Sequence, residues 1–346
     1  MHCLSRILMT GVTTMLLAGA AAPAVAWGPG GHQAVGAIAD QLIAGTPAAR
    51  KVRLLLGTNL QTASVWADCA RAVQSDQGVW TYVIDPKNRR AECAYDENRP
   101  GGQAALVDYV RRNASSCAGA RPPTSQCRHK AYHFTDLPIQ HPAYALGQPG
   151  TAPDDLVQTV GALLAVLAGG KSPAPYDIKG QAEALRLLAH FVGDLHQPLH
   201  VGAVYLSEAG ERLDPATPQE LKDHDTSGGN AILFEGRNLH EAWDGILESQ
   251  YRQALAGDFK AEARQVAATP GAIASWPTAW ASETASRASL AFQDLKFSPK
   301  VRAGFDTGWP ASAPKPTYAQ ARETLQHEQI VKAGARLAKI LGTLWH

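Results

Sequence analysis

The sequence predicts an all-α fold, that is, a mainly α-helical single domain packed around one central stretch. Helical signals dominate, strand signals are few, and the chain holds no repeat of fixed period and no low-complexity tract. The central stretch, residues 190–200, carries three histidines and one aspartate among apolar side chains. His190 and Asp194 are four residues apart and therefore share one face of a helix. Pro198 should end or kink that helix and let His200 point elsewhere.

Apolar residues at helical spacing predict helices along most of the chain. The expected helices cover residues 32–43, 48–56, 64–73, 102–112, 154–168, 178–196, 238–253, 276–292 and 318–344. Short strands are expected at 79–84 and 231–234. Polar or Pro- and Gly-rich stretches predict loops at 85–100, 121–128, 206–229 and 294–316.

The first 26 residues resemble a secretory signal peptide. Arg6 precedes a mostly apolar run, and Ala24-Val25-Ala26 is a small-residue cleavage site that leaves Trp27 as the first mature residue. A membrane anchor is the alternative, but the run is short and rich in Thr, Gly and Ala. We therefore expect one domain over residues 27–346, secreted or periplasmic, monomeric and without stable membrane association.

Net charge excludes long-range capture of a polyanion. Removal of Arg6 with the signal brings the 32 basic residues level with the 31 acidic ones. An anionic substrate would need local positive charge, which metal ions can supply.

Four cysteines remain in the mature chain, and an even count in an exported protein indicates two disulfides. Three pairings are possible. Because short loops close most cheaply, we favour Cys69 with Cys93 and Cys117 with Cys127. Zinc binding by these cysteines is the alternative, although the sequence lacks the C-x2-C spacing.

Further metal-ligand types occur outside the central stretch. Glycines after Trp27 would let its α-amine and His32 meet one ion, unless the terminus is merely flexible. Asp68 has Arg71 one turn on, which an ordinary ion pair would also explain. His133 lies between aromatic residues and equally fits a core position. Residues 238–244 repeat the His-x3-Asp spacing.

Together these segments offer more ligands than one zinc site needs. A closed structural zinc site uses four ligands, so a larger set indicates a cluster. Such clusters activate water and brace the oxygens of a phosphoryl centre. The candidate ligands are the Trp27 amine, His32, Asp68, His133, His190, Asp194, His200, His240 and Asp244.

These motifs together resemble the S1/P1 nuclease family of zinc-dependent single-strand nucleases. The resemblance covers essentially all of the mature chain. Its parts are Trp-Gly-x-x-Gly-His at 27–32, Trp-Ala-Asp at 66–68, His-Phe-x-Asp at 133–136, His-Phe-x-Gly-Asp-x-His-Gln-Pro-Leu-His at 190–200, Gly-Gly-Asn at 228–230 and Asn-Leu-His-x-x-Trp-Asp at 238–244. It implies a mainly helical fold with three Zn²⁺ ions at the bottom of a cleft.

The resemblance also implies how the ligands divide among three ions. Asp68, His133, His190 and Asp194 would hold one zinc. His200, His240 and Asp244 would hold a second. The amine and carbonyl of Trp27 would hold a third, together with His32 and the bridging Asp194.

Other roles follow from the same resemblance. Asp136 would orient or deprotonate the attacking water, and Arg71 would stabilise charge on the phosphate. Phe134 would stack on a base and Asn230 would help to hold the nucleotide. His196 lies in the motif but is not a family ligand. The implied substrates are single-stranded DNA and RNA and nucleotides, cut to 5′-phosphate products by an endonuclease that could also act as a 3′-nucleotidase.

One departure and two rival functions remain open. Residues 203–227 form a longer segment than in fungal members, either a cleft wall or a solvated insertion. Zinc-dependent phospholipase C shares the fold and cluster, but its last His-x3 motif usually ends in Glu, where this chain has Asp244. A zinc-stabilised binding protein is the non-enzymatic alternative, and it would leave Asp136 and Arg71 without a purpose.

Overall fold

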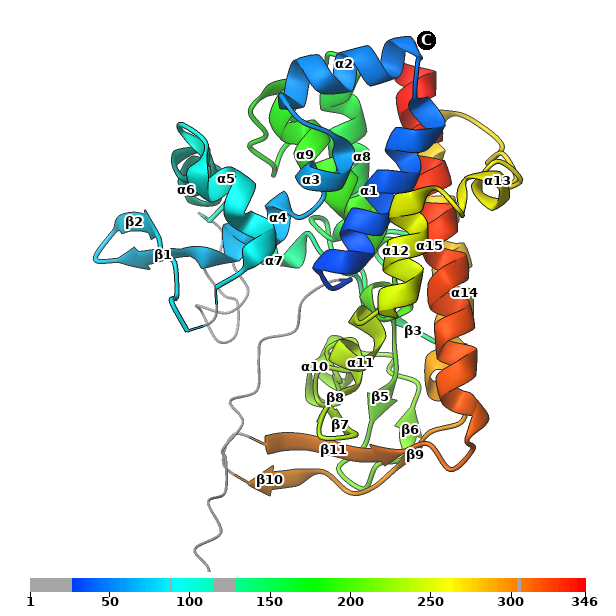
Figure 1. Cartoon of the computed structure of the whole chain (residues 1–346). Helices are drawn as coiled ribbons and strands as arrows, with labels where there is room; N and C mark the ends of the chain where they lie inside the picture. The colour runs from blue at the N-terminus through cyan, green and yellow to red at the C-terminus, as the bar shows by residue number, and fades with distance from the viewer. Residues whose placement is uncertain (1–26, 88, 115–127, 304–305) are drawn as a thin grey trace, which may run out of the picture.

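Helices form most of the molecule, as the sequence predicts (Figure 1). The computed structural model describes residues 27–346 apart from 88, 115–127 and 304–305. The α-helices are α1 (Pro29–Ile43), α2 (Pro47–Leu56), α3 (Leu60–Ala63), α4 (Trp66–Cys69), α5 (Ala94–Asn98), α6 (Gly102–Asn113), α7 (Arg128–Ala131), α8 (Leu156–Leu167), α9 (Gly180–Asp194), α10 (Pro218–Asp223), α11 (Leu239–Asp244), α12 (Glu248–Ala256), α13 (Lys260–Ala263), α14 (Trp276–Phe292) and α15 (Thr317–Leu344). Short 3₁₀ helices are η1 (Ala70–Ala72), η2 (Ala91–Cys93), η3 (Pro198–His200) and η4 (Ile273–Ser275).

The strands are short and pair in small sheets. They are β1 (Val73–Asp76), β2 (Val79–Tyr82), β3 (Leu137–Pro138), β4 (Gly202–Ala203), β5 (Tyr205–Leu206), β6 (Arg212–Leu213), β7 (Ile232–Phe234), β8 (Arg237–Asn238), β9 (Lys296–Phe297), β10 (Val301–Ala303) and β11 (Asp306–Ser312). The largest sheet has the order β10-β11-β7-β8, with β9 added on β11. It lies at the lower end of the molecule in Figure 1, below the helices.

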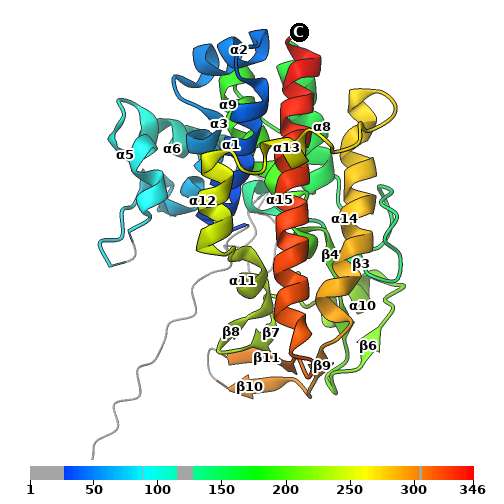
Figure 2. The ribbon, with the colours of Figure 1, turned by 45° about the vertical axis from the view of Figure 1, so that its right-hand side comes forward.

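Helix α9 is the centre of the helical layer. It packs against α8, α15, α1 and α2, and its residues from Leu187 to Asp194 are buried. Figures 1 and 2 both show α1 and α15 running side by side in front of it. Gly334 permits this approach, since a Cβ there would lie 2.6 Å from the Ile38 side chain. The polar side chains of the last turn of α9, His190 and Asp194, are therefore buried.

Several loop and helix predictions were wrong because long-range contacts override local sequence. Residues 294–316 form β9, β10 and β11 instead of an irregular stretch, since β11 pairs in parallel with β7, far back in the chain. The predicted helix 238–253 breaks into α11 and α12. The break follows Asp244, where the Gln326 amide donates to the Gly245 carbonyl.

Local polarity also misled the loop predictions. The stretch 85–100 contains η2 and α5. The stretch 206–229 contains β6 and α10. Thr217 and Glu220 form a capping box at the N-terminus of α10. At 64–73, α4 and η1 are followed by strand β1 from Val73 onwards.

One disulfide is present among the described residues. Cys69 and Cys93 are joined at an S–S distance of 2.03 Å, which confirms that pairing. Cys117, Cys127 and most of the loop 121–128 lie outside the described residues, as do residues 1–26. Within the described ranges no helix is both long and apolar enough to cross a bilayer.

Candidate metal centre

Eight of the nine candidate ligands, all histidines and aspartates, converge from five stretches of the chain. In Figure 1 the start of α1 lies mid-molecule, close to α4 and above α11. Histidine and aspartate ligand atoms lie within 4.8 Å of one another in each of three groups. The groups are His32, Asp68 and His190; His133, His190 and Asp194; and His200, His240 and Asp244. All of these side chains are buried. The structure therefore brings together, in one region, residues as far apart in the sequence as His32 and Asp244, which are 212 positions apart.

Asp194 lies between two of the groups. Its Oδ2 is 3.0 Å from Nδ1 of His133 and 3.3 Å from Nε2 of His190, one turn earlier on α9. Its Oδ1 is 3.4 Å from Nε2 of His32. Each carboxylate oxygen thus faces a different set of imidazoles, the arrangement that a bridging ligand requires.

Backbone carbonyls fix which nitrogen of three histidines carries the proton. Nδ1 of His190 donates to the Ser64 carbonyl at 2.7 Å, and Nδ1 of His240 donates to that of Gly228 at 2.7 Å. Nδ1 of His200 donates to the His133 carbonyl at 2.6 Å. In the rings of His200 and His240, Nε2 is left with a free lone pair, as in a metal-binding histidine held by a second hydrogen bond. Nε2 of His190 faces Asp194, whose carboxylate raises the pKa of His190 against the opposing effect of burial.

The arrangement of acceptors fits a cation. Nε2 of His200 and Nε2 of His240 are 3.0 Å apart with no proton available between them. Several buried ligand atoms have no hydrogen-bond partner within the described chain, namely both ring nitrogens of His32, Oδ2 of Asp68, Oδ1 of Asp194 and Oδ2 of Asp244. Buried polar atoms are rarely left unpaired. Imidazole nitrogens and carboxylate oxygens are metal donors, so bound metal ions would account for these unpaired atoms.

Burial also sets the protonation states. It lowers the pKa of His32, His133 and His200, helped by neighbouring imidazoles, so these rings are neutral, the form that binds metal. Burial raises the pKa of Asp194 to about 6 and that of Asp244 well above the usual range. Bound cations would restore ionised carboxylates at neutral pH.

The segment at Trp27 is tied to two ligand-bearing elements. Its indole is buried and donates to the Gly193 carbonyl on α9 at 2.9 Å. The next amide, of Gly28, donates to the Asp244 carbonyl at 2.9 Å. Gly193 must lack a side chain, because a Cβ there would lie 2.8 Å from Nδ1 of His32. Trp27 is thereby held beside His32.

Comparison with known proteins agrees with the family resemblance of the sequence motifs. The S1/P1 nuclease family model matches residues 103–346. The chain belongs to the S1/P1 nuclease family. Endonuclease 2 of Arabidopsis thaliana is 24% identical over 98% of this chain and 97% of the relative. Endonuclease 4 of the same plant is 26% identical over 47% of this chain and 50% of the relative. Family membership makes the protein a nuclease, a hydrolase of phosphodiester bonds.

Arg71 forms an ion pair with Asp68, one of the candidate ligands of this S1/P1 nuclease site. Its guanidinium nitrogen lies 3.4 Å from Oδ1 of Asp68, and its side chain is 24% exposed. Its charge opposes the rise that burial causes in the pKa of Asp194, and it adds to the fall that burial causes in the pKa of His240. It therefore lies at the boundary between the buried groups and solvent, where a phosphate could meet it.

The other predicted residues lie around the three groups instead of within them. Phe134 and Asp136 flank Thr135, whose amide donates to the His200 carbonyl at 2.8 Å, and both are half-buried. Asn230 donates from its side-chain amide to the Ser227 carbonyl at 2.7 Å, and its Oδ1 is buried without a partner in the described structure. All three residues lie close in the chain to the candidate ligands or to backbone that contacts them. Phe134 and Asp136 follow His133, and Asn230 follows Gly228, whose carbonyl accepts from His240.

The long segment 203–227 packs against Asp136. Tyr205 on β5 is buried, donates to the Asp136 carbonyl at 2.7 Å and forms a bridge with Asp225. Burial raises the pKa of Asp136 well above the usual range, and the charges of Asp225 and Asp155 raise it further. Asp225 therefore helps to set the pKa of Asp136, a role that no local sequence pattern predicts.

His196 and Gln197 complete the central stretch. The buried His196 ring donates to the Val192 carbonyl at 2.7 Å and accepts from Arg336 on α15 at 2.9 Å, so it faces away from the ligand groups. Gln197 is buried and donates to Asp244 at 2.7 Å. Sequence reasoning missed Gln197, although a glutamine inside an apolar, ligand-rich motif was a usable signal.

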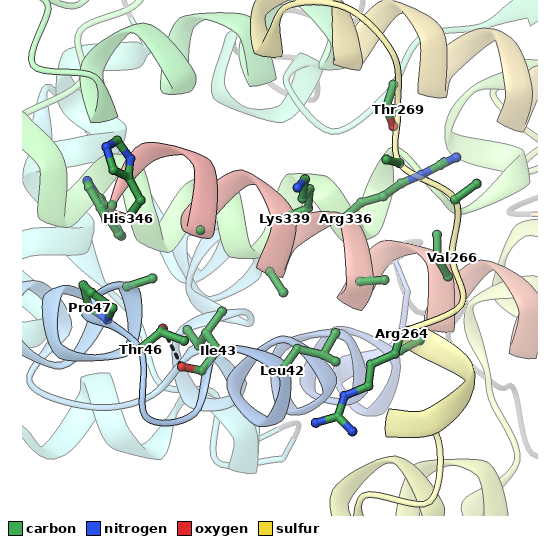
Figure 3. A pocket seen from close by; sticks show the side chains of 18 of the residues that line it. Leu42, Ile43, Thr46, Pro47, Arg264, Val266, Thr269, Arg336, Lys339 and His346 are labelled. Carbon is green, nitrogen blue, oxygen red and sulfur yellow. Dashed lines mark hydrogen bonds between the residues drawn. The ribbon is translucent and has the colours of Figure 1, made fainter.

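A separate cavity lies away from these groups. It has a volume of about 520 Å³, lies between α1, α15 and the segment before α14, and is lined by residues such as Leu42, Val266 and Lys339 (Figure 3). None of the candidate ligands is among the described residues that line it. The three buried His/Asp groups, and not this cavity, therefore define the candidate site.

Proposed function

We propose that the protein is a zinc-dependent endonuclease that cleaves single-stranded DNA and RNA and leaves 5′-phosphate ends. The observation that carries the proposal is the set of three buried His/Asp groups joined through Asp194, in a chain of the S1/P1 nuclease family. Imidazole and carboxylate oxygen together favour zinc over magnesium, which prefers oxygen ligands alone. Plant relatives named endonucleases support the same reaction class.

We assign three Zn²⁺ ions to the nine candidate ligands. Asp68, His133, His190 and Asp194 would hold the first, and His200, His240 and Asp244 the second. The third would take the amine and carbonyl of Trp27 with His32 and Asp194. When bound, the zinc ions would lower the pKa of water toward neutral and offset the negative charge of the phosphate.

Protein side chains supply the remaining steps. Arg71, partly exposed beside Asp68, would pair with a phosphate oxygen and stabilise the charge that develops on it. Asp136, with its raised pKa, would accept the proton of the attacking water. Phe134 would stack on a base and Asn230 would bind it through its unpartnered Oδ1.

Burial of the ligands favours a flexible strand over a duplex. Each His and Asp ligand side chain is at least nine-tenths buried, so a phosphate must be brought inward to reach them. A single strand can bend a phosphate into such a site, whereas duplex phosphates are held on a stiff helix. The Cys69–Cys93 disulfide supports a secreted or periplasmic location.

The test is digestion of matched substrates by the mature, zinc-loaded protein. Single-stranded DNA, single-stranded RNA, the same sequences as duplexes, and phosphatidylcholine are incubated in parallel, and product ends are identified by mass spectrometry. We expect cleavage of both single strands, slower cleavage of duplexes, and 5′-phosphate ends. Release of phosphocholine without nucleic-acid cleavage would support the phospholipase C alternative. The binding-protein alternative predicts no cleavage of any substrate.

A further inference from the structure

Gln197 contacts a candidate metal ligand directly, although it is not a ligand type that zinc uses. It follows α9 and precedes η3, and its side chain is fully buried. Its Nε2 donates to Oδ1 of Asp244 at 2.7 Å. Its Oε1 accepts from the Leu199 amide. The amide therefore links the central stretch, which carries Asp194 and His200, to α11.

The orientation of the Gln197 amide is fixed by its neighbours. The Leu199 amide can only donate, so the atom that it meets is the oxygen. The amide nitrogen must then face Asp244 and donate to it. Oδ2 of Asp244 stays buried with no hydrogen-bond partner within the described residues. One carboxylate oxygen is held by Gln197, and the other is left free to bind a metal.

The backbone around Asp244 is held by different residues. The Gly28 amide donates to the Asp244 carbonyl at 2.9 Å. Nε2 of Gln326 on α15 donates to the carbonyls of Trp243 at 2.7 Å and of Gly245 at 2.9 Å. These contacts fix where α11 lies but not how the Asp244 carboxylate turns. Gln197 is the described residue that donates a hydrogen bond to that carboxylate.

We propose that Gln197 is a positioning residue that holds Asp244 in its metal-binding orientation and so sets the zinc affinity of the His200–His240–Asp244 group. The inference rests on the proposed metal role of that group. Loss of a hydrogen-bond partner behind a metal ligand typically weakens metal binding by about 10- to 100-fold. The effect should be confined to one zinc. The Gln197 side chain bonds only to Asp244 and the Leu199 amide among the described residues, and its bond to Asp194 is made by the backbone amide, which a side-chain substitution leaves in place.

The experiment compares Gln197→Met with Gln326→Met in the mature protein. Both replace a buried glutamine near Asp244 with an apolar side chain of similar length, but only Gln197 touches the carboxylate. Zinc affinity is measured by competition with a chromophoric chelator, and zinc content by elemental analysis. We expect Gln197→Met to weaken one zinc per chain by about 10- to 100-fold. Gln326→Met should lower thermal stability and change the zinc affinities much less than Gln197→Met does, because it removes contacts to the backbone beside Asp244 and none to the carboxylate.

Two further measurements keep the test decisive. If Gln197→Met does not fold, Gln197→Asn serves instead, because its shorter amide cannot reach both partners. At saturating zinc, cleavage of single-stranded DNA should recover its kcat with KM unchanged. Unchanged zinc affinity in the Gln197 variants, or an equal loss in Gln326→Met, would overturn the proposal. The zinc titration does not depend on cleavage, so a wild type that binds zinc but cuts no nucleic acid would refute the function and leave this inference intact.

Discussion

Replacing Asp194 with asparagine should release two metal ions at once. Its Oδ2 faces His133 at 3.0 Å and His190 at 3.3 Å, while its Oδ1 faces His32 at 3.4 Å. Asn keeps the shape but removes the charge that both groups share. Asp244→Asn is the matched control, because the same change there affects only the group with His200 and His240.

The size of the effect follows from ligand linkage. An ion present at 100 times its Kd stabilises the folded chain by about 2.7 kcal/mol, so three ions contribute about 8 kcal/mol. Asp194→Asn should retain about 3 kcal/mol of this and Asp244→Asn about 5 kcal/mol. At about 2 °C per kcal/mol for a chain of this length, zinc should raise Tm by about 16 °C in the wild type. The corresponding increments are about 5 °C for Asp194→Asn and about 11 °C for Asp244→Asn.

The assay is the zinc-dependent increment in Tm of each protein, measured by calorimetry with saturating zinc and with excess chelator. Taking the increment within each variant cancels the direct effect of the substitution on the metal-free fold. Elemental analysis of the same samples gives the zinc content. Equal increments and equal zinc content in the two variants would refute the bridging role of Asp194.

Three other predictions concern processing, charge and pH. A chain that keeps residues before Trp27 cannot offer a free amine there, so it should bind the third zinc poorly and cleave much more slowly; equal zinc content and activity would refute this. Arg71→Met should lower kcat by about 10²- to 10³-fold with zinc content unchanged, and a wild-type kcat would exclude its role in charge stabilisation. Asp136 must be ionised to accept a proton, so kcat should fall as the pH drops through its raised pKa. Asp225→Asn removes a charge that raises that pKa and should extend activity to lower pH, whereas an unshifted acid limb in the pH profile of kcat would contradict this reading.

The helical frame could be predicted because its signals are local. The apolar periodicity of 276–292 matches α14 at both ends, and the helix that carries His190 and Asp194 ends before Pro198. Strands β9 to β11 could not be predicted, because β9 and β10 both pair with β11, and β11 pairs with β7 more than 60 positions earlier in the chain, a pairing that no local pattern records.

In the candidate site, the ligands could be predicted from the sequence but the residues that support them could not. The ligand types and their spacing were visible in the sequence, and the structure brings His and Asp candidates from distant motifs into three groups. Supporting residues were not visible. Whether Gln197 donates to Asp244, or the charge of Asp225 acts on Asp136, depends on how separate loops pack. Those arrangements exist only in the folded chain.

Elemental analysis of the purified mature protein is the most direct test of the central claim. The account predicts three zinc ions per chain. It also predicts that chelation abolishes cleavage of single-stranded DNA and that added zinc restores it. A fully active protein with one zinc or none would contradict the assignment of the three His/Asp groups to a zinc cluster.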